Sequence, residues 1–241
     1  MLVPTLLGGG KELPPVNMLR EAGCVTTPIG QVFPVLDLRV SAGDLELRGI
    51  SDDDLVTLGA LAARGIHAPD RMPFSFPWTD VAPEELPLNF AQYHWRTRAD
   101  FSPASWVLNL GVWWRGELVG VQGVTTSNFV VRRTGETGSW LGAEHQGRGL
   151  GTLMRQAMCV LLFDHLGFTE ITSGAFVDNP ASLAVSRKVG YRVNGTERYE
   201  RRGELAEMTM LSLGPGDLVR PDVPVEVSGA EPVRRLIGVA D

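Results

Sequence analysis

Apolar side chains recur along the chain with two different periods, which predict its helices and strands. The clearest helix ends before Gly167, and its apolar face is Leu150, Leu153, Met154, Ala157, Met158, Leu161 and Leu162. A second helix is expected over 52–64, because Ser51 caps it and three aspartates fill its first turn. Further helices are predicted at 83–99 and 180–189.

Short apolar segments and segments with period-two alternation predict the strands. They lie at 45–48, 106–114, 118–126, 137–141, 170–176, 191–200 and 205–213. The polar residues 132–136 are expected to form a turn. Strands that alternate with helices in this order favour an α/β or α+β three-layer sandwich with antiparallel pairs in a mixed sheet.

The strong patterns occupy only the middle of the 241-residue chain. Residues 1–44 are mostly rich in Pro and Gly and are interpreted as an N-terminal extension. Residues 45–213 are predicted to form one domain, and residues 214–241 a C-terminal tail.

The composition of the chain disfavours several classes of protein. A net charge of −6 gives no footprint for nucleic-acid binding, and no apolar run approaches the roughly 20 residues of a membrane span. The two cysteines, Cys24 and Cys159, form neither a disulfide framework nor a metal cluster. A soluble cytoplasmic protein without a metal is therefore expected.

Three alternating glycines, Gly147, Gly149 and Gly151, join the strand at 137–141 to the long helix. Glycines let the backbone approach a ligand, and the free N–H groups of a helix start can bind phosphate. The P-loop is excluded because Arg148 and Gly149 replace its Lys and Ser/Thr. A dinucleotide fingerprint is disfavoured because Thr152 takes its third glycine position.

A third glycine pattern, [Gln/Arg]-x-x-Gly-x-[Gly/Ala], fits Gln146, Gly149 and Gly151. Downstream come Asn179-Pro180-Ala181-Ser182 at a helix start and Val189-Gly190-Tyr191 at its end. With these motifs the chain resembles the GNAT superfamily of N-acyltransferases over about 45–213. The aromatic loop at 67–74 and the run at 176–191 are similar to the RimJ/RimL branch, in particular its actinobacterial members.

The resemblance implies a GNAT-like α/β/α sandwich around a mixed, mostly antiparallel, splayed sheet. It also implies acetyl-CoA, or another acyl-CoA such as succinyl-CoA, as co-substrate. The implied coenzyme A-binding residues are Trp140, Leu141, Gly142, Gln146, Gly147, Arg148, Gly149, Leu150, Gly151, Thr152, Asn179 and Ser182. A backbone N–H near 141–143 is a candidate oxyanion donor.

The proton-transfer residues are less clearly indicated. Many relatives carry a tyrosine acid seven residues after the motif asparagine, where this chain has Ser186. Ser186 and Glu144 are the catalytic candidates, while Glu136, His145, His94 and bound water stay open as the base. Cys159 has no assignable partner, so direct attack of an amine on the thioester is expected.

The acceptor side is expected to involve Arg71, Phe74, Trp78 and His94. A cation at position 71 could bind a carboxylate on the acceptor or on a succinyl group. The expected partner is an amine-bearing small molecule, a protein N-terminus or a lysine, and homo-oligomerisation stays open. The alternative is a non-catalytic acyl-CoA sensor, which the serine at position 186 favours.

Overall fold

The computed structural model describes residues 27–239, so Cys24 and most of the predicted N-terminal extension lie outside it. The nine strands are β1 Arg39–Ala42, β2 Leu45–Gly49, β3 Val107–Trp114, β4 Glu117–Thr126, β5 Thr134–Leu141, β6 Glu170–Phe176, β7 Arg192–Arg201, β8 Glu204–Leu213 and β9 Val225–Ser228. The helices are α1 Ile29–Val32, α2 Asp52–Ala63, α3 Leu86–Ala99, α4 Phe129–Arg132, α5 Leu150–Val160, α6 Pro180–Val189 and α7 Ala230–Leu236.

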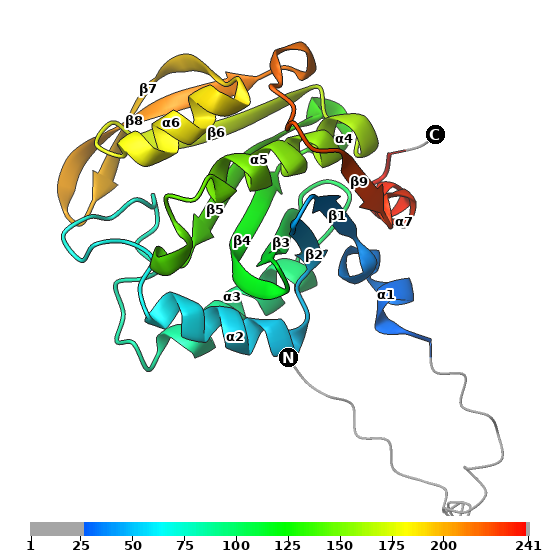
Figure 1. The fold of residues 1–241 in the computed structure, drawn as a ribbon, viewed down its shortest axis with the longest axis horizontal. Coiled ribbons are helices and arrows are strands. Elements are labelled where there is room, and N and C mark those ends of the chain that lie inside the picture. Colours follow the sequence, from blue (N-terminus) through cyan, green and yellow to red (C-terminus); the bar gives the residue numbers. More distant parts are fainter. Residues whose placement is uncertain (1–26, 240–241) are drawn as a thin grey trace, which may run out of the picture.

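One open sheet organises these elements in the order β7-β8-β6-β5-β4-β3-β2-β1-β9. All neighbouring strands are antiparallel except β5 and β6, which are parallel. The sheet fans out across the molecule, with α5 and α6 over one part of it and α2 and α3 beside another (Figure 1). The predicted mixed, mostly antiparallel α/β fold is confirmed.

Two apolar cores hold the layers together. The larger core packs α5 against the sheet and includes Met154, Met158, Leu47 and Leu108. The smaller core packs α2 and α3 against the opposite face of the strands and includes Leu58, Phe90 and Val121. Alternate strand positions therefore face two different helix layers, as a sheet covered on both sides requires.

Local sequence signals explain the helix starts. Ser51 Oγ accepts from the N–H of Asp54, whose carboxylate accepts from the N–H of Ser51, which completes a capping box at α2. Asn179 Oδ1 accepts from the N–H of Ser182 at the start of α6, where Pro180 occupies the first helical position.

Three segments differ from the prediction. Residues 132–136 are not a turn, because α4 ends at Arg132 and β5 already begins at Thr134. Strand β1 precedes the expected start of the domain and forms a hairpin with β2. Part of the expected tail is strand β9, which pairs with β1 from Arg39↔Ser228 to Ala42↔Val225. A four-residue strand is too short to show a clear period in sequence.

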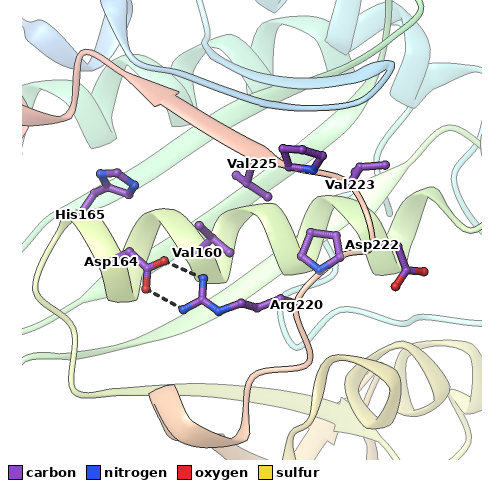
Figure 2. Close-up of a pocket in the computed structure, with 9 residues that line it drawn as sticks. Val160, Asp164, His165, Arg220, Asp222, Val223 and Val225 are labelled. Atoms are coloured by element: carbon purple, nitrogen blue, oxygen red, sulfur yellow. Dashed lines mark hydrogen bonds and ion pairs between the residues drawn. The ribbon is translucent and has the colours of Figure 1, made fainter.

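The segment before β9 is hydrogen-bonded to α5 and to the residues that follow it. The guanidinium of Arg220 makes two hydrogen bonds, 2.7 and 2.9 Å, to the carboxylate of Asp164. Gln156 Nε2 donates to the carbonyl of Val219 at 2.9 Å. Figure 2 shows the surface hollow beside this ion pair, with Val160 and His165 from the helix side and Val223 and Val225 from the tail. These contacts lie at the opposite end of α5 from the glycine loop.

Within residues 27–239, no helix has the length and apolar character needed to cross a bilayer. The same part of the chain holds no group of three or more His, Cys, Asp or Glu side chains placed to bind a metal ion.

Candidate active site

The glycine loop connects β5 to α5 and leaves open space above its backbone. Gly147 and Gly149 have φ angles of +73° and +83°, a region that side chains with a Cβ rarely adopt. An added Cβ at either position would meet no atom within 4 Å. Helix α5 starts at Leu150; Thr152 and Leu153 donate to the carbonyl of Gly149, and the N–H groups of Leu150 and Gly151 have no partner within the helix. Positive partial charge and free space make this an anion site.

Two side chains of the loop have different roles. Gln146 Nε2 donates to the carbonyls of Ile66 and Leu141, at 2.8 and 2.9 Å. The side-chain nitrogen of Gln146 therefore fixes the loop to the segment after α2. Its side-chain oxygen remains available to a ligand. Arg148 is exposed and forms no ion pair with any described residue, so its guanidinium is available to a phosphate.

Strands β5 and β6 separate immediately before this loop. They pair only at Thr134↔Glu170, Gly135↔Ile171 and Glu136↔Thr172. Beyond that point β5 runs on to Leu141 and β6 to Phe176 without further pairing. The two strands thus diverge, with α5 and α6 over this part of the sheet (Figure 1), and the region between them is called the wedge below.

Side-chain hydrogen bonds cross the narrow end of the wedge. Thr137 Oγ1 donates to the carbonyl of Thr172 at 3.2 Å, and Ser173 Oγ donates to the carbonyl of Thr137 at 3.2 Å. One step further out, Arg155 from α5 donates to Ser173 Oγ at 3.3 Å and to Ser139 Oγ at 3.0 Å. These links replace the missing backbone ladder.

Most of the predicted donor-side residues surround the wedge. Leu141 is buried in the larger core, and Trp140 is half-buried against Trp78 and Phe90, with ring centroids 5.9 Å apart in each pair. The N–H groups of Gly142 and Ala143 donate to backbone carbonyls, at 3.0 and 3.1 Å. They are therefore not free to serve as oxyanion donors, which corrects part of the 141–143 prediction.

The predicted catalytic pair does not meet. Ser186 is completely buried on α6, and its Oγ has no hydrogen-bond partner among the described residues. Glu144 is exposed, and backbone hydrogen bonding, together with the guanidinium of Arg64 at 3.4 Å, lowers its pKa. A carboxylate held in this ion pair, outside the wedge, is poorly placed to take a proton there.

Glu136 is better placed than Glu144. It belongs to the last residue pair between β5 and β6, and its side chain points to the face opposite α5. Protein atoms around the carboxylate reduce its solvation and raise its pKa, and the carboxylate of Glu197 on β7 raises it further. The residue is nevertheless solvent-accessible, so an acceptor can reach it; the surroundings of Glu136 and Glu197 are called the recess below.

An aromatic loop borders this recess. Phe74 packs against His67 and Trp78, with ring centroids 5.8 and 5.4 Å apart. The loop reaches the tip of the β7–β8 hairpin (Figure 1), where Arg202 makes two hydrogen bonds to Asp80, at 2.6 and 2.7 Å. Phe74 and Trp78 thus belong to one aromatic cluster with Phe90 and Trp140, and their contact with the acceptor stays a prediction.

The other two predicted acceptor residues lie differently. Arg71 is exposed at the edge of the loop, where its charge contributes to lowering the pKa of Asp178. His94 is only 4% exposed and packs against Phe90, with centroids 4.5 Å apart and ring planes tilted by 52°. Burial, with a smaller contribution from the charge of Arg98, lowers its pKa to about 4. His94 is thus a neutral core residue, which argues against its predicted contact with the acceptor.

The buried thiol of Cys159 is not a nucleophile. Burial raises its pKa to about 12. Its Sγ lies 3.8 Å from the hydroxyl of Tyr191, which is also buried and hydrogen-bonded to Thr137. The thiolate that nucleophilic catalysis requires is therefore not formed near neutral pH.

Comparison with known proteins decides the family. Residues 44–192 match the family model described as Acetyltransferase (GNAT) domain. The chain belongs to the GNAT acetyltransferase family. A likeness to solved structures supports the same fold. Mycobacterium smegmatis RimJ in complex with CoA-disulfide is 20% identical, with a TM-score of 0.64, over 81% of this chain and 90% of that chain.

Two further GNAT structures are similar to a comparable extent. A RimL ribosomal alpha-N-protein acetyltransferase in an apo form is 17% identical, with a TM-score of 0.56, over 73% of this chain and 94% of that chain. A spermidine N-acetyltransferase chimera from Vibrio cholerae and hSSAT is 18% identical, with a TM-score of 0.57, over 71% and 95%. These likenesses support the GNAT fold, and the family model confirms the predicted membership of the chain among the GNAT acetyltransferases.

The residues present fit coenzyme A. The open space at the Cβ positions of Gly147 and Gly149 lets a phosphate group approach the backbone there. Within the described residues, buried Gln122 Oε1, Arg155 Nε and Ser186 Oγ all lack a hydrogen-bond partner. Gln122 and Arg155 both adjoin Ser139 on β5, beside the wedge. Unpaired buried polar atoms beside the diverging strands are groups that a bound ligand would be expected to satisfy.

Proposed function

We propose that this protein transfers an acetyl group from acetyl-CoA to a primary amine, with Glu136 as the general base. The observation that carries the proposal is the position of Glu136 at the last pair between β5 and β6, where the wedge opens toward the glycine loop. The loop of residues 147–152, with Arg148, would bind the pyrophosphate. Trp140, Leu141, Gly142, Asn179 and Ser182 would border the pantetheine arm, and Gln146 would brace the loop.

The base must be deprotonated yet able to accept a proton from the attacking amine. A carboxylate with a raised pKa suits this task better than an ordinary one, because the best catalytic pKa lies near the operating pH. Glu136 meets this condition through reduced solvation and the nearby Glu197. The same two carboxylates attract a protonated amine into the recess.

The backbone of β5 is suited to stabilise the oxyanion. The carbonyls of Thr137 and Leu141 accept bonds on the wedge side of the strand, from Ser173 and Gln146. Ser139 lies between them with the same orientation, so its N–H also faces the wedge beyond the last pair with β6. We assign the oxyanion contact to the N–H groups of Ser139 and Leu141. Ser186 would relay a proton only if the bound donor reaches its buried hydroxyl.

The charge of the recess favours acetyl over succinyl as the transferred group. A succinyl carboxylate that extends toward the acceptor side would approach Glu136 and Glu197. Of the nearby cations, Arg201 is already paired with Asp178 through two hydrogen bonds of 2.7 and 2.9 Å. Arg71, at the outer edge, is the remaining candidate to bind such a carboxylate. A cytoplasmic location and a homo-oligomer stay predictions from the sequence.

A thiol-release assay tests the proposal. Acetyl-CoA and succinyl-CoA are each paired with a peptide bearing a free N-terminus, an N-blocked peptide with one lysine, and spermidine. Turnover is expected with acetyl-CoA and at least one amine. No turnover with any pair, together with no calorimetric binding of either donor, would refute the function. Binding without turnover would support the acyl-CoA sensor instead.

Three glutamine variants test the base. Glu136→Gln is expected to lower kcat by roughly 100-fold or more, within the range of general base catalysis. Glu144→Gln examines the competing candidate. Glu170→Gln is the matched control, because Glu170 is exposed at the far end of β6 from the wedge mouth. If Glu136→Gln kept full activity and Glu144→Gln lost it, Glu144 would be the general base.

A further inference from the structure

Arg155 is a buried cation without an acidic partner. It is 5% exposed on α5, where Met154, Ala157 and Met158 around it are buried and apolar. Its guanidinium contacts the hydroxyls of Ser139 and Ser173 and the ring of Tyr191, whose centroid lies 6.0 Å from the guanidinium carbon. No carboxylate of residues 27–239 forms an ion pair with it, and its Nε has no partner.

A purely structural role does not explain such a residue well. An unpaired buried charge costs several kcal/mol, and an apolar side chain would fill the same space on this helix without that cost. Two neutral hydroxyl acceptors recover only part of the lost hydration. The arginine is therefore a residue whose charge has a use when the wedge is occupied.

The position of Arg155 defines that use. Ser139 belongs to β5 and Ser173 to β6, and both lie beyond the last backbone pair at Glu136↔Thr172. The planar guanidinium reaches both hydroxyls at once, which a lysine ammonium cannot do with the same geometry. Arg155 thus bridges the two edges of the wedge from the α5 side, next to the backbone assigned above to the oxyanion.

We propose that Arg155 is a positioning residue that fixes the spacing of β5 and β6 and supplies positive charge that favours the thiolate of coenzyme A in the wedge. The inference rests on the proposed function. In the transfer, a bond forms between the amine nitrogen and the acetyl carbon, the carbon–sulfur bond breaks, and the sulfur leaves with the bonding electron pair. The amine proton passes to Glu136. A cation near the wedge stabilises the negative charge that develops on sulfur.

Among residues 27–239, no other titratable group on the α5 side of the wedge neutralises the positive charge of Arg155. Cys159 from α5 and Tyr191 after α6 both have raised pKa values because they are buried, so both are neutral near pH 7. Glu136 lies on the opposite face of β5. The neighbouring positions on β4 and β6, Gln122 and Ser173, do not titrate.

The test measures the thiol pKa of coenzyme A bound to the protein, from the ultraviolet absorbance of the thiolate as pH is raised. In the wild-type complex this pKa is expected below that of free coenzyme A. In Arg155→Met it is expected to rise by roughly one pH unit, the effect of one charge a few ångström away in a partly solvated site. Arg155→Lys keeps the charge and is expected to restore most of the shift.

Three further measurements separate positioning from folding. The double variant Ser139→Ala, Ser173→Ala keeps the charge but loses its anchors, so kcat is expected to fall while the affinity for the amine changes little. Gln156→Met is the matched control: it removes a buried polar group from the same helix, whose partner is the carbonyl of Val219 in the tail. Thermal unfolding of every variant reports the structural contribution.

The outcomes are distinct. If Arg155→Met binds coenzyme A with the wild-type thiol pKa, the inference is wrong and the proposed function stands. If Gln156→Met shifts the thiol pKa as much, the effect is a general loss of packing and the inference is also wrong. If the wild-type protein neither binds coenzyme A nor turns over, the proposed function itself fails. Should Arg155→Met not fold, the lysine and double-serine variants decide the question.

Discussion

Replacement of Gly149 by glutamate tests the phosphate site, because the geometry allows its two effects to be separated. Gly149 has a φ of +83° and open space where its Cβ would lie. Any side chain there costs roughly 1–2 kcal/mol of backbone strain. The glutamate also places a negative charge in the space assigned to the pyrophosphate. Two like charges about 4 Å apart repel by about 1 kcal/mol in water and about 4 kcal/mol at an effective dielectric constant of 20.

We therefore expect Gly149→Glu to lose about 2–4 kcal/mol of coenzyme A binding, roughly a 30-fold to 1000-fold rise in Kd. Isothermal titration calorimetry at low salt measures this, and higher salt should reduce the loss. Gly116→Glu is the matched control: Gly116 also has a φ of +83°, also has open space for a Cβ, and lies in the β3–β4 turn. Both variants should lose similar stability, and only Gly149→Glu should lose affinity. Unchanged affinity in a folded Gly149→Glu protein would refute the site assignment.

Three other predictions follow from the contacts of single side chains. Glu197→Gln removes a charge that raises the pKa of Glu136, so the acid limb of the kcat/KM profile is expected to move to lower pH; an unmoved limb would show that the two carboxylates are not coupled. Burial lowers the pKa of His94 in the folded protein from its ordinary value of 6.5 to about 4. The unfolded chain therefore takes up a proton first, and the free energy of unfolding is expected to fall by up to about 3 kcal/mol as pH drops from 6.5 to 4. Denaturant unfolding of His94→Phe should lack this part of the pH dependence, and an identical pH dependence would contradict the assignment. Ser186→Ala is expected to retain coenzyme A affinity and lower turnover; equal turnover would remove Ser186 from the mechanism.

Local patterns were sufficient to predict the helices α5 and α6 and the glycine loop between β5 and α5. The amphipathic face of α5, the glycines before it and the cap at Asn179 are each set by a few neighbouring residues, and the structure has them where the pattern predicts. The capping box at Ser51 is equally local. The family resemblance added the ligand, which no spacing alone could name.

Long-range pairing limited the rest. The proposed role of Glu136 depends on the point at which β6 stops pairing with β5. It also depends on the carboxylate of Glu197, which is distant in the sequence and raises the pKa of Glu136. The neighbouring residues, 132–136, predicted a turn because they are polar and include a glycine. His94 shows the converse, since a polar side chain on a helix gave no sign that Phe90 and Tyr93 bury it.

Strand β9 and Arg155 were missed for the same physical reason. Residues 225–228 form a strand only because β1, almost two hundred residues earlier in the chain, offers a free edge. Arg155 lies in the middle of the best-predicted helix, and only its contacts with Ser139 and Ser173 distinguish it from a surface arginine. Sequence periodicity predicts on which face of a helix or strand a residue lies, but not which residues of other elements its side chain contacts.

The central claim is that the glycine loop and the β5–β6 wedge form one site for acetyl transfer. Nuclear magnetic resonance with acetyl-CoA labelled with ¹³C at the acetyl carbonyl tests both halves in one titration. The backbone amide signals of residues 147–152 are expected to shift on addition of the donor, and the label is expected to move from thioester to amide when an acceptor amine follows. Shifts confined to other parts of the chain, with the label left on the thioester for every amine, would contradict the account.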